Sequence, residues 1–274
     1  MSSPSAFVLC DPSADDVCIH SFLLTSVYHY GIDETNAWSQ LPLYHSPGLF
    51  EDRVQHLFQK YLAAASNPVL ASSALPSVRR SAKPDLVFYQ SSFWDLALWA
   101  QQDIDAGSSA VSDLPEDRLL TWRSRNVDML ASLASAFGQD VPILWRSIHY
   151  PTDNAGATVE WFTGQEDPAA KAAGSVNSPD AAAPTKKNHP LFHLNRIQQL
   201  NHAQLSTLMP SGDDVVRGKR NRAATLPDSV QLAPWGQVLI GQDHMQQDMI
   251  TPSANPGGSI FAEMVLWNLE VSNP

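Results

Sequence analysis

The chain has 274 residues, of which 43% are hydrophobic and 9% aromatic. This length is ample for one α/β domain and marginal for two. The formal net charge of −11 gives an acidic surface that repels phosphate backbones, so we expect no nucleic-acid partner. No apolar run is long enough to span a membrane, and the N-terminus, MSSPSAFVLC, lacks the basic and apolar regions of a signal peptide.

The first part of the chain alternates apolar runs with helical patterns. The stretch 21–31, SFLLTSVYHYG, predicts a strand that Gly31 ends. Apolar residues with the spacing of one helix face follow in 48–65, GLFEDRVQHLFQKYLAAA. The nearly unbroken apolar run 85–90, DLVFYQ, is typical of a strand covered on both faces, and the pattern in 92–107 predicts a helix after it.

The second part continues the alternation. The clearest helix spans 113–138, where Asp113 is the expected cap and Pro115 falls in the first turn. The sequence then predicts a buried strand at 141–146, a helix at 190–209, a short strand at Gly236–Gly241 and a last helix at 259–270. This order favours an α/β fold with a doubly wound, mostly parallel sheet.

Two polar stretches interrupt this single domain of residues 1–274. The stretch 152–189 is rich in Ala, Gly, Ser, Pro and Asp, and we expect a long disordered insertion there. The stretch 210–228, which contains RGKRNR, is read as a second polar loop with solvated charges.

The sequence gives no sign of a metal site or a cofactor. Only two cysteines occur, Cys10 and Cys18, and two thiols do not complete a four-ligand zinc site. They are compatible with a small disulfide loop or with two unlinked thiols, and both readings stay open. His189 and His193 have the i, i+4 spacing of a metal-binding pair, but Pro190 disfavours a helical backbone at His189.

Polar residues follow three of the predicted strands, where a doubly wound sheet carries its reacting groups. The first group follows 85–90 and comprises Ser91, Ser92, Trp94 and Asp95. The second, WRSIHYP, contributes Arg146 and His149, and the third, QDHMQQD, contributes His244 and Asp248.

These three blocks, in this order, resemble the SGNH (GDSL-type) hydrolases. The blocks YQSSFWDL, LWRSIHYP and QQDMITPSANPGGSIFAEMVLWNLE look most like the PC-esterase-like branch, which includes fungal capsule-associated polysaccharide O-acetylation proteins. The resemblance implies an SGNH/flavodoxin-like three-layer fold and ester hydrolysis or acyl transfer. It also implies a carbohydrate or an acylated small molecule as the partner, and a place in the secretory pathway.

The resemblance also implies roles for individual residues. Asp248 matches the carboxylate that orients the catalytic base, Ser91 and Ser92 stand where oxyanion donors belong, and Trp94 and Asp95 wall the pocket. Arg146 and His149 would bind the substrate or tune the oxyanion. Structural alternatives stay open: Asp95 as a helix cap, Arg146 paired with Asp95, and Ser92 as a strained replacement for glycine if its φ is positive.

Two parts of the family's machinery are missing. No Gly-Asp-Ser occurs in the sequence, and Thr251 stands where the family has its catalytic histidine. We therefore expect a diverged or N-terminally truncated protein that lacks the first strand and is inactive by the ordinary serine mechanism. The alternatives are a non-catalytic carbohydrate- or acyl-binding module, and an enzyme with a relocated nucleophile and His244 as its base.

Overall fold

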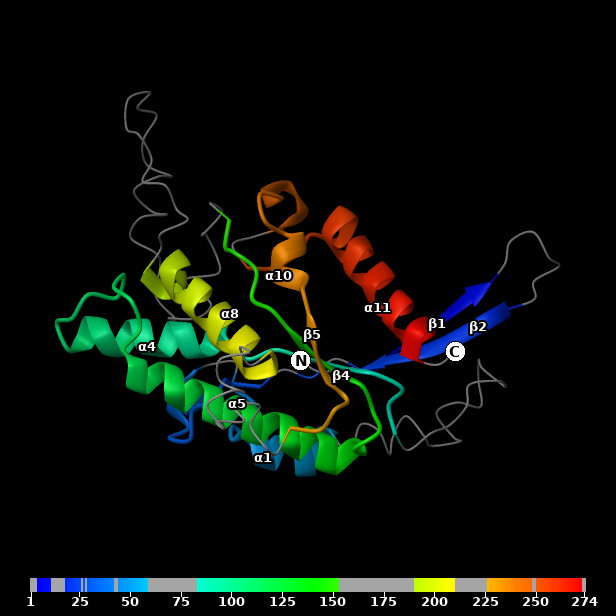
Figure 1. The fold of residues 1–274 in the computed structure, drawn as a ribbon, viewed down its shortest axis with the longest axis horizontal. Coiled ribbons are helices and arrows are strands. Elements are labelled where there is room, and N and C mark those ends of the chain that lie inside the picture. The colour runs from blue at the N-terminus through cyan, green and yellow to red at the C-terminus, as the bar shows by residue number, and fades with distance from the viewer. Residues whose placement is uncertain are drawn as a thin grey trace, which may run out of the picture.

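The structure is a computed structural model that describes residues 4–10, 18–25, 27, 29–41, 44–58, 83–152, 190–209, 226–247 and 250–272, with backbone alone for 4–10, 18–25, 190 and 272. It contains a three-stranded parallel sheet and a separate two-stranded antiparallel hairpin (Figure 1). The hairpin pairs β1 (Pro4–Cys10) with β2 (Cys18–Thr25).

The parallel sheet has the strand order β3-β4-β5. Its members are β3 (Val87–Tyr89), β4 (Ile143–Arg146) and β5 (Val230–Ala233). The central strand β4 is buried along three of its four residues, which explains why its sequence, ILWR, reads as an apolar run. This arrangement confirms an α/β fold with parallel strands.

Helices contact both faces of the parallel sheet, as Figure 1 shows for α5 and α11. Trp122 of α5 packs on Trp145 of β4 with ring centroids 5.6 Å apart, whereas Phe261 of α11 packs on Phe88 of β3 at 5.3 Å. The described helices are η1 (Ala37–Gln40), α1 (Phe50–Arg53), η2 (Val54–Phe58), α4 (Phe93–Asp105), α5 (Glu116–Phe137), η4 (Pro190–Phe192), α8 (Leu194–Leu208), α10 (Trp235–Val238), η5 (Asp243–Met245), η6 (Ala254–Gly258) and α11 (Ser259–Ser272).

The strand predicted at Gly236–Gly241 is wrong, because residues Trp235–Val238 form helix α10 and the strand β5 lies earlier, at Val230–Ala233. Pro234 has no N–H group to donate to a neighbouring strand, so the strand ends there. A Cβ atom at Gly236 would lie 2.2 Å from the carbonyl oxygen of Ile148, so only glycine allows α10 to approach the segment after β4 this closely.

Two further boundaries differ from the prediction. Helix α5 begins at Glu116, with Pro115 at its cap position and no side-chain cap bond, so Asp113 does not cap it. Strand β2 ends at Thr25 rather than at Gly31. A turn lies at Gly31 and Ile32, and Gly31 has a φ of +79°.

Some predictions fall on residues outside the described ranges. Of the stretch 152–189, the structure describes Thr152, which is buried, and Pro190 begins the next described segment. Of 210–228 it describes only 226–228. Cys10 and Cys18 are Cα partners in the hairpin, but their side chains are outside the description.

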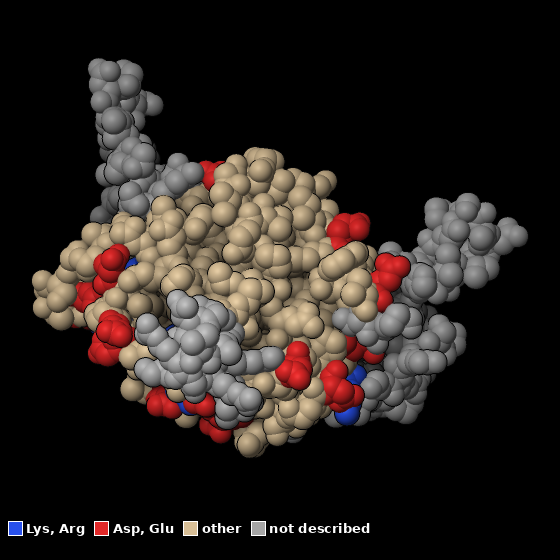
Figure 2. Space-filling view, viewed as in Figure 1, with Lys and Arg blue, Asp and Glu red and all other residues tan. Residues whose placement is uncertain are grey.

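The face drawn in Figure 2 carries acidic side chains scattered near its rim and few basic ones. This distribution agrees with the net charge of −11. Within the described ranges, none of the helices combines the length and the apolar character that crossing a membrane requires.

Candidate functional site

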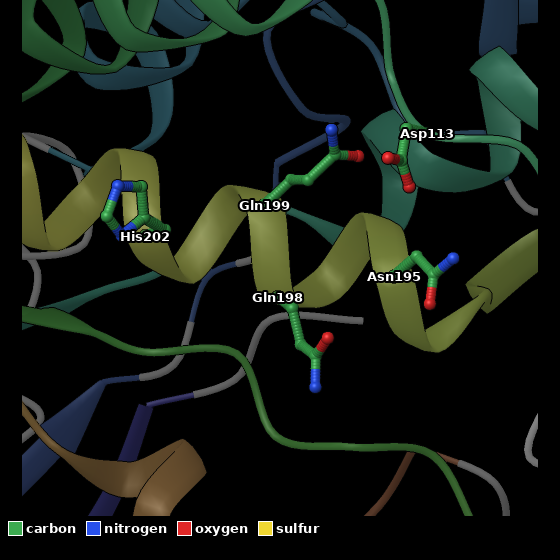
Figure 3. A pocket seen from close by; sticks show the side chains of 5 residues that line it. All are labelled: Asp113, Asn195, Gln198, Gln199 and His202. Atoms are coloured by element: carbon green, nitrogen blue, oxygen red, sulfur yellow. The ribbon is translucent and has the colours of Figure 1, made fainter.

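A hollow of about 430 Å³ lies along helix α8 (Figure 3). It is lined by Asp113, Asn195, Gln198, Gln199 and His202. Gln199 anchors this region, because its amide oxygen accepts the Leu114 N–H at 2.7 Å and its amide nitrogen donates to the Leu114 carbonyl at 3.3 Å. Nothing in the sequence marks this hollow, because the four lining residues on α8 have the pattern of an ordinary polar helix face.

The residues of the first two predicted blocks lie elsewhere, at the carboxyl ends of β3 and β4 and in the segments that follow them. Gln90 links them. Its side-chain amide donates to Ser92 Oγ at 3.0 Å, its side-chain oxygen accepts from Arg146 Nη2, and its carbonyl oxygen accepts from His29 Nε2 at 2.8 Å. The neighbouring parallel strands thus bring the Ser92 and Arg146 blocks together, as the sequence predicts.

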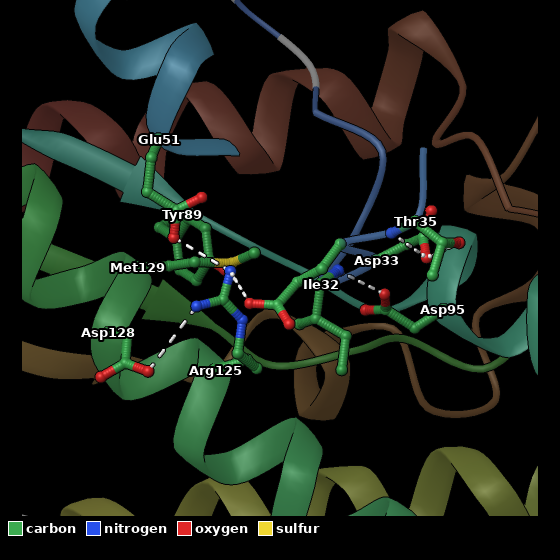
Figure 4. Close-up of polar contacts among 10 residues, drawn as sticks. Ile32, Asp33, Thr35, Glu51, Tyr89, Asp95, Arg125, Asp128 and Met129 are labelled. Carbon is green, nitrogen blue, oxygen red and sulfur yellow. Dashed lines mark hydrogen bonds and ion pairs between the residues drawn. The ribbon is translucent and has the colours of Figure 1, made fainter. Parts of the chain in front are cut away.

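Asp95 is a buried acceptor with three hydrogen-bond donors around it, of which Figure 4 shows Ile32. It accepts the Ile32 N–H at 2.6 Å, and its other oxygen accepts the Ser91 hydroxyl at 2.7 Å and the Trp122 indole N–H at 3.3 Å. Burial raises the pKa of this carboxyl to about 6, against the lowering effect of these hydrogen bonds. Asp95 therefore neither caps α4 nor pairs with Arg146, and both alternatives are corrected.

The turn that Asp95 holds explains Gly31. A Cβ atom at Gly31 would lie 2.0 Å from Asp95 Oδ1, and the positive φ there disfavours any other residue. The Asp95 carboxylate therefore links the turn at Gly31 and Ile32 to the first turn of α4 by a hydrogen bond.

Ser91 and Ser92 are both 3% exposed. Ser92 has a φ of −176°, which is extended backbone that any residue adopts, so serine is not strained at this position. It precedes helix α4 without making a side-chain cap bond. The hydroxyl of Ser91 donates to a carboxylate rather than to an imidazole.

Arg146 ends strand β4 and is partly exposed. Its guanidinium carbon lies 5.4 Å from the ring centroid of Phe261. Its Nε is buried without a hydrogen-bond partner, and burial lowers the pKa of the group to about 10. Among the described residues, the only side-chain oxygen that accepts from this guanidinium belongs to Gln90, which carries no charge.

His149 and Trp94 take up different surroundings. His149 is 2% exposed, donates Nε2–H to the Ile250 carbonyl at 2.7 Å, and meets the Phe93 ring edge-on at 5.2 Å. Trp94 packs edge-on against Tyr30 at 5.0 Å and Trp38 at 4.8 Å. His149 thus lies between the strand edge and the C-terminal segment, whereas Trp94 packs against the segment 30–38.

The third predicted block is only partly described. His244 lies in η5 and is exposed. Thr251 is also exposed. It follows Ile250, whose carbonyl accepts the hydrogen bond from His149, and this bond links the segment to the end of β4. Asp248, the predicted orienting carboxylate, lies outside the described residues.

The sequence reasoning missed His29 as a member of this cluster. Its ring stacks on Tyr89 at 5.4 Å, its Nδ1 accepts the Gly31 N–H at 3.2 Å, and its Nε2–H donates to the Gln90 carbonyl. Both ring nitrogens are satisfied in the neutral form, and burial lowers the pKa of His29 to about 4. The signal that could have found it is a histidine inside the otherwise apolar run 21–31.

Within the described part of the chain, no group of three or more His, Cys, Asp or Glu side chains is arranged to hold a metal ion. Comparisons with protein-family models, with curated proteins and with solved structures give no match for this chain.

Proposed function

We propose that this chain is a diverged SGNH-type protein, related to esterases and acyltransferases and built on a doubly wound sheet. In this proposal it binds an O-acyl, in particular O-acetyl, ester on carbohydrate and does not hydrolyse it by the ordinary serine mechanism. The observation that carries the proposal is the use of Ser91 and Asp95 as a structural pair. The Ser91 proton points at a carboxylate that also holds the Ile32 N–H and the Trp122 indole.

Acyl transfer from serine needs a base within hydrogen-bond reach, held in the right orientation by a third group. Asp95 is in reach of Ser91, but a carboxyl with a pKa of about 6 is a weak base for an alcohol, and two other donors already engage its oxygens. These bonds stabilise the resting arrangement and leave no imidazole in the role of the base. This supports binding rather than turnover.

The groups that remain suit recognition of an oxygen-rich ligand. The Arg146 guanidinium lies between neutral partners and retains an unpartnered Nε–H. The N–H groups of a guanidinium can bind an ester carbonyl or a sugar hydroxyl. Phe261 and Phe93 supply apolar ring surface close to Arg146 and His149.

The test combines binding and turnover on the same protein. An O-acetylated neutral oligosaccharide is titrated by calorimetry, and acetate release from it is followed by NMR, with Ser91→Ala as the matched variant. We expect binding and no acetate release above the buffer rate in either protein.

Two other results would contradict the proposal. Acetate release that disappears in His244→Ala and survives in Thr251→Ala would replace the proposal by an enzyme with a relocated nucleophile. A folded protein that shows neither binding nor acetate release would remove the carbohydrate role.

A further inference from the structure

Arg146 differs from Arg196, which is buried, and from Arg125, which is partly buried, because both of those arginines form ion pairs. Arg196 pairs with Asp103 at 2.6 Å, and Arg125 pairs with Glu51 at 3.0 Å. Arg146 has no acidic partner in the part of the chain that the structure describes, and its side-chain contacts there are the neutral amide of Gln90 and the ring of Phe261.

A partly buried arginine without an acidic partner lowers the stability of the folded chain. Moving a charge out of water is strongly unfavourable unless an opposite charge or a full set of hydrogen bonds replaces the hydration. Here one of the N–H groups, at Nε, is removed from solvent and left without a partner. Because the residue as a whole is only partly buried, a ligand that approaches from the solvent can place a negative charge next to the guanidinium without reaching the buried Nε.

We propose that Arg146 binds a carboxylate on the ligand, so that the saccharide recognised at this edge is an acidic one that contains uronic acid. That the ligand is a saccharide rests on the proposed function, whereas the preference for a carboxylate comes from Arg146 alone. The planar guanidinium matches a carboxylate through two parallel N–H···O bonds, which a neutral acetyl carbonyl cannot reproduce.

Gln90 is a positioning residue in this site. Its amide oxygen holds Nη2 of Arg146, while its amide nitrogen donates to Ser92 and its carbonyl accepts from His29. The fork of the guanidinium is therefore fixed in direction by a neutral group that does not compete with an incoming anion. Replacing this amide by a carboxylate would neutralise Arg146 internally.

The experiment measures affinities of three probes by calorimetry at constant, low ionic strength. The probes are tetragalacturonate, its carboxyl-reduced neutral counterpart, and an O-acetylated neutral oligosaccharide. The proteins are the unaltered chain, Arg146→Gln, Arg146→Lys, Gln90→Glu and the control Arg123→Gln. Arg123 is also partly buried but lies on α5 and bonds Thr207 of α8.

We expect the unaltered chain to bind the acidic probe at least about tenfold more tightly than its neutral counterpart. This preference should disappear in Arg146→Gln and in Gln90→Glu, shrink in Arg146→Lys, and survive in Arg123→Gln. Gln90→Glu keeps a partner on Arg146, so a purely structural role of Gln90 would leave the preference unchanged. A thermal melt of each variant identifies any that fails to fold.

Equal affinity for the acidic and reduced probes, or an acid preference that Arg146→Gln and Gln90→Glu both retain, would overturn the inference. In that case binding of the O-acetylated neutral probe would leave the proposed function standing. Conversely, binding of the acidic probe alone would retain the role of Arg146 and remove the acyl-ester ligand.

Discussion

Two buried titratable residues, His29 and Asp95, have pKa values displaced in opposite directions. Burial lowers the pKa of His29 to about 4 and raises that of Asp95 to about 6. Between pH 4 and pH 6 the folded chain therefore keeps Asp95 protonated and His29 neutral, whereas the unfolded chain ionises both. The two contributions to stability change with pH in opposite senses and largely cancel.

His29→Gln should remove one of these contributions. The folded pKa of His29 lies below its unfolded value of 6.5, so its share of stability is complete above pH 6.5 and is lost as the pH falls towards 4. The stability advantage of the unaltered chain over His29→Gln should shrink by about 3 kcal/mol over that range. Urea unfolding followed by tryptophan fluorescence measures it, with the exposed His202→Gln as the control. A difference that does not vary with pH would contradict the buried neutral histidine.

Asp95→Asn should show the reverse trend. The folded pKa of Asp95 lies above its unfolded value of 3.8, so the unfolded chain releases this proton first and the advantage of the unaltered chain falls as the pH rises from 3.8 to 6. The expected change is about 3 kcal/mol. The same urea series reports it, and Asp105→Asn, an exposed position on the same helix, serves as the reference. An advantage that grows with pH would mean that the three donors outweigh burial.

At the scale of elements, α10 depends on a close backbone approach. The Gly236 N–H donates to Ser147 Oγ at 2.8 Å, and a Cβ atom there would meet the Ile148 carbonyl. Gly236→Ala should therefore lower the free energy of unfolding by about 1–3 kcal/mol, because a backbone atom cannot move aside cheaply. Gly107→Ala is the comparison: its Cβ meets open space, and only the positive φ costs energy, about 1 kcal/mol. Chemical denaturation of both variants should rank Gly236→Ala as the more damaging.

The strands that the sequence predicts well are those of the sheet that lie between two layers of helices. Residues 85–90 and 141–146 are apolar runs because helices pack on either side of β3 and β4. Strand β5 was missed because VQLA is only four residues long and is buried at its two ends but not at its two middle positions, so it shows neither a continuous apolar run nor a clear alternation. The strand was predicted instead in the more apolar run at 236–241, whose first residues belong to helix α10.

The sequence predicts which strand-end residues lie near one another, but it does not predict the hydrogen bonds that they form. Parallel strands share a carboxyl edge, so the blocks at Ser92 and Arg146 had to lie close together. The hydrogen bond from the Ile32 N–H to Asp95 could not be predicted from the strand order, because Ile32 lies 63 residues away along the chain. His29 was hidden for the same reason, since its bond to Gln90 spans 61 residues.

At the scale of the whole molecule, Asp103 joins three helices. Its carboxylate on α4 pairs with Arg196 of α8 at 2.6 Å and with Arg118 of α5 at 2.8 Å. Asp103→Asn would leave two arginines without their carboxylate, one of them 1% exposed, and should lower stability by about 3–5 kcal/mol. Asp140→Asn removes an exposed pair with Lys83 and should leave the melting temperature unchanged. Differential scanning calorimetry compares them, and equal melting temperatures would show that the three-helix link contributes nothing.

The strand order has a consequence for how fast the chain assembles. Tyr89 meets Asn126 across 37 residues, whereas Ser147 meets Gln237 across 90. Closing the longer loop costs more chain entropy, so β3 and α5 should come together before β5 docks on β4. Until β5 arrives, one edge of β4 is an unpaired row of backbone groups that can capture another chain. Refolding yield should therefore fall as protein concentration rises, and mutual repulsion between chains of net charge −11 works against that loss.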